Sequence, residues 1–338
     1  MMMKRYTMNM GAGLDGLRLE QVPRPQPGLG EVLVAVRAVS LNYRELSILV
    51  DGRYPLPVKP DVVAVSDGAG EVLALGAGVD RVKVGDRVIA SIFPRWIDGP
   101  FRMEVIEQLG GSRDGMLSEY VCLPQEALVP IPEHLGYEEA STLPCAALTA
   151  WHAVTAAGPL GAGETVLVLG TGNVSLLALQ FARMCGARVI ATTSSAAKAQ
   201  RLRELGADAV IDYAAMPRWA PEVRRLTQGA GVDRVVEVAG GSLAESLQAT
   251  RLGGHVSLVG TRGGSASVDV GALFGSGATI HPIAVGNFAQ LQAMVAAIAL
   301  HKLKPVMDET FAFDQAPQAF RYYAEGRSFG KVVIRVGG

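Results

Sequence analysis

Residues 165–175 read Thr-Val-Leu-Val-Leu-Gly-Thr-Gly-Asn-Val-Ser, and this stretch decides the fold. Its first five residues are β-branched or leucine, a composition typical of a strand buried in a parallel sheet. A glycine turn follows, and residues 176–182 then place apolar side chains at helical spacing. Strand, tight turn and helix in this order predict an α/β fold organised around a parallel sheet.

The glycine turn has the spacing of a dinucleotide-binding fingerprint. Gly170 permits a sharp turn, and Gly172 lets the backbone approach a pyrophosphate closely. A helix that starts near Asn173 points its N–H groups toward that anion. Ser175 stands where a third glycine is preferred. The residues predicted to bind the pyrophosphate are Gly170, Thr171, Gly172, Asn173 and Val174.

The end of the next strand, at residues 187–192, distinguishes two nicotinamide cofactors. An NAD site normally carries Asp or Glu about 20 residues after the glycines, where it holds the ribose 2′-OH. This chain offers Ser194, Ser195 and Lys198 instead. A 2′-phosphate suits this set, because a carboxylate would repel it and a lysine attracts it. The pattern favours NADP(H) over NAD, and over a polar loop with a helix-capping serine and an exposed lysine.

Length and composition exclude several classes of protein. The chain has 338 residues, enough for two domains, with 49% hydrophobic and 19% charged residues. A net charge of −1 gives no electrostatic reason to expect nucleic acid or an anionic membrane as a partner. No stretch reaches the ~18 apolar residues of a membrane span. The N-terminus also lacks the apolar run of a signal peptide.

The three cysteines, Cys122, Cys145 and Cys185, are far apart and lie in apolar surroundings. No C-x-x-C pattern occurs, so the sequence gives no sign of a cysteine-rich zinc lobe or a disulfide framework. We interpret each cysteine as a small buried apolar residue. This usage fits a reducing compartment, and we expect a cytoplasmic protein.

The patterns divide the chain into a β-rich part and an alternating part. Short strands separated by Gly and Pro run to about residue 123 and predict a barrel-like unit. Later strands, near 165–169, 187–192, 208–211, 232–238 and 254–259, alternate with helices. Further helices are expected at 288–302 and 316–325, and a last strand at 331–336 is expected to pair back with the N-terminal unit. The predicted domains are 1–133, 134–284 and 285–338, the first and last forming one unit.

Six short motifs resemble the medium-chain dehydrogenase/reductase superfamily, and the likeness covers nearly the whole chain. The motifs occupy residues 68–72, 84–88, 143–151, 170–172, 205–208 and 330–333. The resemblance implies a GroES-like catalytic domain split across both termini, with a Rossmann domain between them. It also implies a homodimer, which in this branch commonly forms by pairing an edge strand near residues 278–283.

Zinc-dependent members of this superfamily hold their metal with Cys, His and a second Cys. By resemblance, Asn42 stands at the first Cys position and Ser66 at the His position, and only Cys145 matches a ligand. Neither an amide nor a hydroxyl is a usual zinc donor, and one thiolate cannot hold the metal alone. We therefore predict no metal site, and a zinc-free branch similar to quinone oxidoreductases and enoyl reductases.

Without a metal, reduction of a conjugated C=C bond needs a hydrogen-bond donor for the developing enolate and a proton for the α-carbon. Tyr54 matches the tyrosine that zinc-free enoyl reductases place beside the nicotinamide. The alternative for Tyr54 is an aromatic ring that only packs. Asn42 resembles the asparagine that quinone reductases keep near the cofactor. Tyr54 and Asn42 are our candidate catalytic residues.

The resemblance and the expected sheet edge add further cofactor residues. Tyr213 matches a family tyrosine near the adenosine phosphate. Gly240, Val259 and Gly260 follow strands whose carboxyl ends meet where open sheets bind ligands. Val285 lies in a segment that resembles the one giving backbone contacts to the nicotinamide amide.

The sequence thus predicts a zinc-independent, NADPH-dependent oxidoreductase that reduces an enone, enal or quinone at C=C. One alternative is an alcohol dehydrogenase or carbonyl reductase of the same superfamily. An alternative of another class is a protein that binds the cofactor without turnover.

Overall fold

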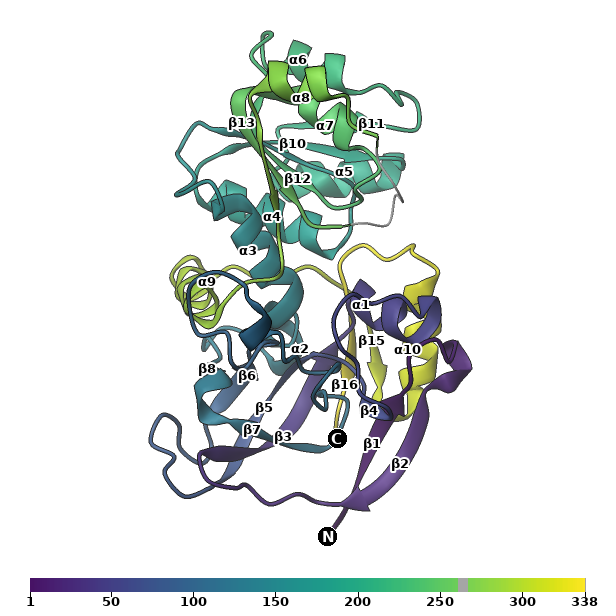
Figure 1. Ribbon diagram of the computed structural model, residues 1–338, viewed down its shortest axis with the longest axis vertical. Coiled ribbons are helices and arrows are strands. Elements are labelled where there is room, and N and C mark those ends of the chain that lie inside the picture. Colours follow the sequence, from purple (N-terminus) through teal and green to yellow (C-terminus); the bar gives the residue numbers. More distant parts are fainter. Residues whose placement is uncertain (261–266, 338) are drawn as a thin grey trace. The chain divides into compact units, whose positions relative to one another are not determined.

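The computed structural model describes residues 1–260 and 267–337. These residues form two compact units (Figure 1). Unit 1 is Met1–Leu148 with Asn287–Gly338, and unit 2 is Thr149–Gly286. Each unit has its own sheet and its own buried core.

Unit 2 is built on a six-stranded sheet in the order β11-β10-β9-β12-β13-β14, with every pair parallel. Its strands are β9 (Thr165–Val168), β10 (Arg188–Thr193), β11 (Ala209–Asp212), β12 (Val232–Glu237), β13 (Thr250–Leu258) and β14 (Thr279–Pro282). All four residues of β9 are buried, as expected for a strand covered on both faces. The chain runs outward from β9 to β11 and returns to β12 on the other side of β9. The carboxyl ends of β9 and β12 therefore flank the switch point at which such sheets bind ligands.

Helices connect these strands and pack against the sheet (Figure 1). They are α4 (Asn173–Met184), α5 (Ala196–Glu204), α6 (Ala220–Leu226), α7 (Leu243–Ala249) and α8 (Val270–Ser276), with α3 (Leu148–Thr155) leading into the unit. α4 buries Leu176, Leu179 and Phe181, the apolar positions that predicted it. The alternation of parallel strands and helices confirms the predicted Rossmann architecture.

Unit 1 is mostly antiparallel. One sheet has the order β15-β16-β3-β5-β6-β8, with β7 also paired to β3, and a smaller sheet has the order β2-β1-β4. The strands are β1 (Met2–Met8), β2 (Arg18–Pro23), β3 (Glu31–Ser40), β4 (Val62–Val63), β5 (Asp67–Leu75), β6 (Arg87–Ala90), β7 (Tyr120–Pro124), β8 (Leu128–Pro130), β15 (Met307–Ala312) and β16 (Lys331–Arg335). β16 pairs antiparallel with β3, which confirms that the last strand returns to the N-terminal part of a GroES-like unit.

Short helices and turns complete unit 1. The helices are α1 (Tyr43–Leu46), α2 (Tyr137–Ala140), α9 (Phe288–His301) and α10 (Ala316–Ala324), and the π-helices are η2 (Ser47–Asp51) and η5 (Leu143–Ala147). The 3₁₀ turns are η1 (Leu14–Gly16), η3 (Met103–Val105), η4 (Gln125–Ala127) and η6 (Phe313–Gln315). α10 packs on β15 and β16 through a buried face that includes Phe320 (Figure 1). The first and last parts of the chain thus build one core.

The compact units divide the chain at 148/149 and 286/287, whereas the sequence-based domain boundaries are 133/134 and 284/285. Residues 134–148 belong with unit 1 by packing, because α2 lies against β3 and β5. Within the described residues, no helix has both the length and the apolar character needed to span a membrane.

Candidate functional site

The glycine turn after β9 leaves open space at the start of α4. Gly170 has φ +72°, a left-handed conformation that glycine adopts without strain. No atom lies within 4 Å of where a side chain at Gly170 or Gly172 would begin. Gly172 is the N-cap of α4, and the first N–H groups of a helix have no acceptor within the helix itself. Thr171, Asn173 and Val174 are partly exposed in the same turn, which suits the approach of an anion.

Ser175 takes the place of the third glycine of the fingerprint and bonds to the end of β9. Its side chain is buried, and Oγ donates to the carbonyl oxygen of Leu169 at 2.6 Å. This bond ties the first turn of α4 to the end of β9. The small hydroxyl therefore preserves the close helix–strand packing that the fingerprint needs.

The end of β10 is connected to the glycine turn. The N–H of Gly170 donates to Oγ1 of Thr192 at 3.1 Å. Ser195 is the N-cap of α5, and its Oγ accepts the N–H of Lys198 at 3.4 Å. Ser194 is exposed and Lys198 is partly buried. The capping role considered for a serine thus belongs to Ser195, which leaves its O–H available as a donor.

Tyr213 lies beside the same strand end. It directly follows β11, and its N–H donates to the carbonyl oxygen of Thr193 at 3.0 Å. Its side chain is 41% exposed. Tyr213 therefore lies at the carboxyl edge of the sheet with an accessible ring.

The turn after β12 is held by a buried carboxylate that sequence reasoning missed. Glu237 is fully buried, and its Oε1 accepts the N–H of Gly240 at 2.9 Å. Its Oε2 accepts the hydroxyls of Ser242 at 2.8 Å and Ser246 at 2.6 Å. The available signal was an acidic residue directly after the apolar pair Val235 and Val236, at the end of the strand. Glu237 fixes the turn through Gly240 at the switch point.

The turn after β13 packs against that turn. The N–H of Val259 donates to the carbonyl oxygen of Glu237 at 2.8 Å. A Cβ at Gly260 would lie 1.7 Å from the carbonyl oxygen of Val238, so only glycine fits there. Gly260 is thus required by close backbone packing in unit 2 as well as being a candidate cofactor contact.

Val285 adopts an unusual backbone conformation. Its φ is +45°, which is rare for a β-branched residue. Its carbonyl oxygen accepts a hydrogen bond from Nδ1 of His152 at 2.9 Å. Burial lowers the pKa of His152. Because a carbonyl oxygen only accepts, Nδ1 carries the proton in this hydrogen bond. Backbone strain of this kind gathers at functional sites.

Unit 1 contains a second group of functional candidates, which we call the buried polar cluster. It consists of Asn42, Arg44, Glu45, Ser66, Asp67, Cys145 and Lys331. All are buried except Cys145, which is partly exposed. Two cations and two carboxylates balance in charge. The residue before Ser66 is Val65, another β-branched residue in the left-handed region, at φ +68°.

Lys331 binds one side of the cluster. Its Nζ donates to the carbonyl oxygen of Leu41 at 2.8 Å and to Oδ1 of Asn42 at 2.7 Å, and it lies 3.8 Å from Oδ2 of Asp67. Burial raises the pKa of Asp67 and lowers the pKa of Lys331, and each partner opposes the shift of the other. Oδ2 of Asp67 also accepts the N–H of Cys145 at 3.1 Å.

Arg44 and Glu45 form the other side. Nη1 of Arg44 donates to Oε1 of Glu45 at 2.9 Å, and that oxygen also accepts the N–H and Oγ of Ser66, each at 3.2 Å. Burial lowers the pKa of Arg44, but Tyr54 and Glu45 outweigh it and leave the pKa above its usual value. Arg44 is therefore a fixed cation. Adjacent charges of opposite sign usually form an ion pair at the surface, but this pair is buried, because Glu45 is fully buried.

Tyr54 is attached to this cluster through its hydroxyl. Its O–H donates to Oε1 of Gln108 at 2.8 Å, and its oxygen accepts Nε of Arg44 at 3.2 Å. The guanidinium also lies 5.1 Å from the centre of the Tyr54 ring. The ring is partly buried, and its hydroxyl has two polar partners. Sequence reasoning had no signal for Gln108, a buried residue in a long irregular segment.

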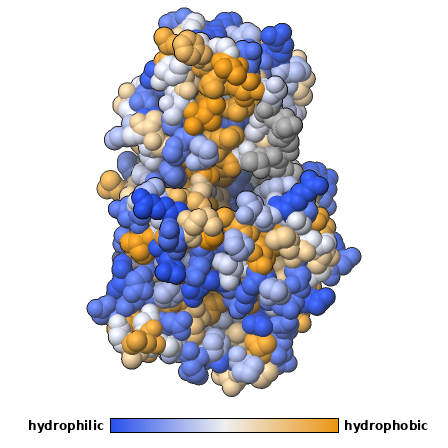
Figure 2. Space-filling view, in the orientation of Figure 1, coloured by the Kyte–Doolittle hydropathy of each residue, from blue (hydrophilic) through white to orange (hydrophobic). Residues whose placement is uncertain are grey.

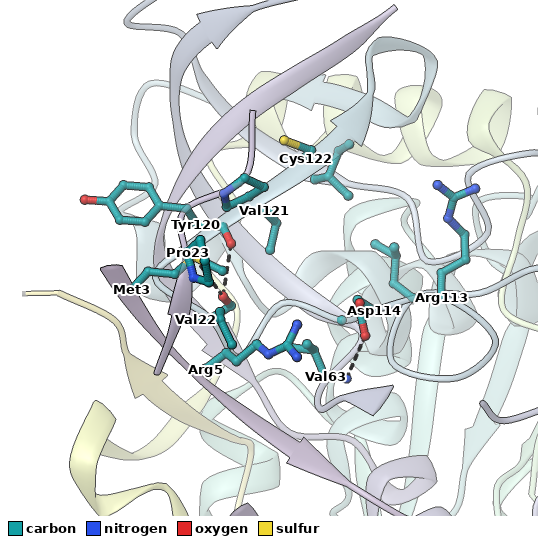
Figure 3. A pocket seen from close by; sticks show the side chains of 15 residues that line it. Met3, Arg5, Val22, Pro23, Val63, Arg113, Asp114, Tyr120, Val121 and Cys122 are labelled. Atoms are coloured by element: carbon teal, nitrogen blue, oxygen red, sulfur yellow. Dashed lines mark hydrogen bonds between the residues drawn. The ribbon is translucent and has the colours of Figure 1, made fainter. Parts of the chain in front are cut away.

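The cavity in Figure 3 belongs to unit 1 but to none of the candidate residues. It has a volume of about 490 Å³. Its charged residues are paired: Arg5 with Glu20, and Asp114 with the N–H of Val63. Burial raises the pKa of the lining Cys122 to about 11, so its thiol is a poor nucleophile.

Comparison with known proteins places this geometry in a family. Residues 28–133 match the alcohol dehydrogenase GroES-like domain, and residues 173–300 match the zinc-binding dehydrogenase family. A zinc-type alcohol dehydrogenase-like protein of Schizosaccharomyces pombe is 39% identical over 335 residues, which are 96% of each chain. The chain belongs to the medium-chain dehydrogenase/reductase superfamily. It is an oxidoreductase of that superfamily, whose members use a nicotinamide cofactor.

Other members of the superfamily differ in their reactions. The 2-methylene-furan-3-one reductase of Solanum lycopersicum is 30% identical, over 98% of this chain and 79% of its own. A chloroplast envelope quinone oxidoreductase homolog of Arabidopsis thaliana is also 30% identical, over 96% and 95%. A Sinorhizobium meliloti structure bearing an alcohol dehydrogenase name has 40% identity and a TM-score of 0.93, over 99% and 98%. A structure named NAD-dependent alcohol dehydrogenase has 33% identity and a TM-score of 0.88, over 99% and 100%.

The residues at the superfamily's zinc position do not fit a zinc ion. Asn42 and Ser66 offer no usual zinc donor, and Oδ1 of Asn42 already accepts Nζ of Lys331. Burial and the carboxylates of Asp67 and Glu45 raise the pKa of Cys145 and so disfavour the thiolate that zinc binds. Within residues 1–260 and 267–337, no three His, Cys, Asp or Glu side chains are grouped so as to hold a metal ion.

Proposed function

We propose that this oxidoreductase is a zinc-independent, NADPH-dependent reductase of conjugated C=C bonds in enones, enals or quinones. The observation that carries the proposal is the buried polar cluster. It has Asn42, Ser66 and Cys145 at the zinc-ligand positions of the superfamily, it ties Asn42 to Lys331, and it connects to the Tyr54 hydroxyl through Arg44. The names of the tomato reductase and the Arabidopsis quinone oxidoreductase homolog belong to this chemistry, whereas other similar proteins carry alcohol dehydrogenase names, so the polar cluster and not the names supports C=C over C=O reduction.

The open edge of the parallel sheet suits the proposed cofactor. When bound, NADPH supplies a hydride. The turn through Gly170, Thr171 and Gly172 and the start of α4 would hold the pyrophosphate. Ser194, Ser195 and Lys198, with no acid among them, would hold the 2′-phosphate, and this set supports NADP(H) over NAD.

In the proposed reaction, hydride addition at the β-carbon moves the π electrons onto the substrate oxygen, which becomes an enolate. Nδ2 of Asn42 would donate to that oxygen, and so would the Tyr54 O–H once it turns from Oε1 of Gln108 to the substrate. The enolate returns its electron pair to the α-carbon, which takes a proton from the Tyr54 O–H or from water. Arg44 donates a hydrogen bond to the Tyr54 oxygen. It would therefore stabilise the phenolate that forms when the Tyr54 O–H gives up its proton.

Product analysis after incubation of the purified protein with NADPH and a simple 2-alkenal tests this function. A saturated aldehyde, with hydride at the β-carbon, supports it. An allylic alcohol places the hydride on the carbonyl carbon and overturns it in favour of carbonyl reduction. Tight NADPH binding without any product, across enals, enones and quinones, would make the chain a binding protein.

Metal analysis tests the zinc-independent part separately. We expect less than 0.1 zinc per chain after purification, an order-of-magnitude limit for adventitious metal, and unchanged turnover after treatment with a chelator. One tightly held zinc per chain, with turnover lost on its removal, would contradict it.

We further propose that the protein is a cytoplasmic homodimer formed through the edge of unit 2. β14 ends the six-stranded sheet, and three nearby apolar side chains are highly exposed: Leu252 at 73%, Val270 at 77% and Phe274 at 88%. Figure 2 shows apolar side chains gathered over this part of unit 2. Exposed patches of this kind mark association surfaces. Light scattering should give a dimer, with Phe274→Asp shifting it toward monomer, and a monomeric parent chain would contradict the proposal.

A further inference from the structure

We infer that Lys331 is a positioning residue that fixes the side-chain amide of Asn42, so that Nδ2 is kept as a hydrogen-bond donor for the substrate oxygen. This inference rests on the proposed function. It assigns to a buried lysine, far from Asn42 in sequence, the orientation of a candidate catalytic group.

The chemistry of the two side chains decides which way the amide lies. A lysine ammonium has three donors and no acceptor, so it can approach only the oxygen of an amide. Nζ lies 2.7 Å from Oδ1 of Asn42. The reverse orientation would set two donors against each other at that distance. Nδ2 must therefore point away from Lys331.

Lys331 is itself held in place. Its Nζ donates hydrogen bonds to the Leu41 carbonyl oxygen and to Oδ1 of Asn42, and Oδ2 of Asp67 lies 3.8 Å away, within ion-pair distance. Its side chain is 1% exposed, and it begins β16, whose register against β3 is fixed by three residue pairs. An ammonium held by the Leu41 carbonyl oxygen, on a strand whose register is fixed, keeps its place if the amide rotates.

The main chain of Asn42 is equally constrained. Its N–H donates to Oε2 of Glu45 at 2.8 Å, and its carbonyl oxygen accepts the N–H of Glu45 at 3.2 Å. The residue is 5% exposed. Among the polar atoms of Asn42, only Nδ2 has no hydrogen-bond partner within the described residues. The Asp67 carboxyl is nearby, and the Asn42 amide lowers the pKa of that carboxyl. A buried donor without a partner is rare in proteins, and a substrate oxygen would satisfy it.

Four variants form the test: Asn42→Asp, Asn42→Leu, Lys331→Met and Asn42→Leu with Lys331→Met. Asn42→Asp keeps an oxygen for Lys331, loses the N–H donors and adds a negative charge, whereas Asn42→Leu removes the donors without adding charge. We expect Asn42→Asp to lower kcat for a 2-alkenal about 10²-fold while NADPH affinity, followed by cofactor fluorescence, changes less than about threefold. Asn42→Leu should lower kcat similarly. Lys331→Met should lower kcat about 10-fold or more, because the amide is free to turn.

The double variant separates positioning from a structural role. If Lys331 acts through Asn42, Lys331→Met has no further effect on kcat in the Asn42→Leu background. If its loss lowers kcat by the same factor in both backgrounds, the inference is overturned. Asp67→Asn accompanies Lys331→Met in both variants that carry it, because it removes the carboxylate that would otherwise be left unpaired, and this guards against failure to fold. Arg335→Met, at an exposed position of the same strand, is the matched control and should leave kcat unchanged.

Failure of the proposed function is distinguishable from failure of this inference. If the parent chain reduces C=O instead of C=C, the four variants are measured with that acceptor, whose oxygen also gains charge. Additive losses would then overturn the positioning role alone. A parent chain that binds NADPH but reduces no acceptor overturns both.

Discussion

We call the carboxyl edge of the unit 2 sheet, with the glycine turn at 170–172 and the start of α4, the cofactor edge. The cofactor edge and the buried polar cluster of unit 1 differ in which atoms are available to a ligand. At the cofactor edge, main-chain groups are available to a ligand, because Gly170 and Gly172 leave open space at the N-terminus of α4. The polar cluster is built from side chains, and almost every polar atom in it is hydrogen-bonded to another. The first region tolerates changes of side chain, whereas the second has paired charges that cannot be removed singly.

The two regions share one feature, a valine forced into the left-handed region. Val65 precedes Ser66 of the polar cluster, and Val285 follows β14 near the cofactor edge. Such residues persist only where surrounding contacts hold them. His152 supplies one such contact to Val285, and the N–H of Met116 donates to the Val65 carbonyl oxygen at 2.7 Å. Strain in both regions supports their assignment as functional parts of the molecule.

The largest expected effect comes from breaking a charge pair in the polar cluster. Asp67→Ala leaves the Lys331 ammonium buried without its carboxylate, and we expect a loss of about 3–5 kcal/mol in the free energy of unfolding. Urea denaturation measures it. In the cofactor edge, Gly172→Ala enters open space and should change stability by less than about 0.5 kcal/mol. Equal losses for the two variants would remove the contrast between the regions.

This contrast also decides what the sequence can predict. The glycine turn is local: strand, glycines and helix lie within about a dozen residues, so their spacing carries the function. The fold followed from the same kind of local signal, although the N-terminal strand β1 has no such pattern and forms because β2 and β4 pair with it.

The polar cluster could be predicted only in part. Asn42, Ser66 and Cys145 were found by resemblance, but their bonds were not, because Lys331 meets Asn42 from 289 positions away in the chain. Gln108 meets Tyr54 from 54 positions away, out of a segment without regular pattern. Contacts of this kind depend on the register of paired strands and on loop packing, which no local spacing reports.

Tyr54→Phe should cause the next largest effect. It removes the O–H donor but keeps the ring under the Arg44 guanidinium, so we expect kcat to fall about 10²-fold with NADPH affinity unchanged. Steady-state kinetics with a 2-alkenal and a fluorescence titration measure the two quantities. Unchanged turnover would remove Tyr54 from the mechanism and leave it a packing residue of the polar cluster.

Lys198→Ala tests the side-chain part of the cofactor edge. Loss of one cation beside a 2′-phosphate should weaken NADPH binding about 10-fold and NADH binding less than twofold. Titrations of both cofactors measure the ratio, and Gln200→Ala on the same helix is the control. Equal weakening of NADPH binding and NADH binding would mean that Lys198 does not contact the 2′-phosphate.

Acid should destabilise unit 2 through two histidines. Burial lowers the pKa of His152, opposed by the Val285 carbonyl and reinforced by His281, and it lowers that of His255, with His281 and Arg234 adding to the effect. Because the pKa of each histidine is depressed in the folded chain, the unfolded chain binds more protons than the folded chain once the pH falls below about 6.5, the ordinary pKa of histidine. Stability is therefore full above that pH and is lost as pH falls through the folded pKa. His255→Phe should flatten the fall in Tm between pH 7 and 5, two ordinary buffer values, and an unaltered slope would contradict this.

Ser175 should give the smallest effect and the finest comparison. Ser175→Ala removes the hydrogen bond to the Leu169 carbonyl, and Ser175→Gly restores the fingerprint residue but adds a flexible glycine to the first turn of α4. Each should lower the free energy of unfolding by about 1 kcal/mol, the first through the lost bond and the second also through helix propensity. NADPH affinity should stay within about twofold for both, because Ser175 acts on packing rather than on the anion. A large loss of NADPH affinity in Ser175→Ala, with normal stability, would show that this side chain binds the cofactor. It would contradict the proposal that main-chain groups alone hold the pyrophosphate.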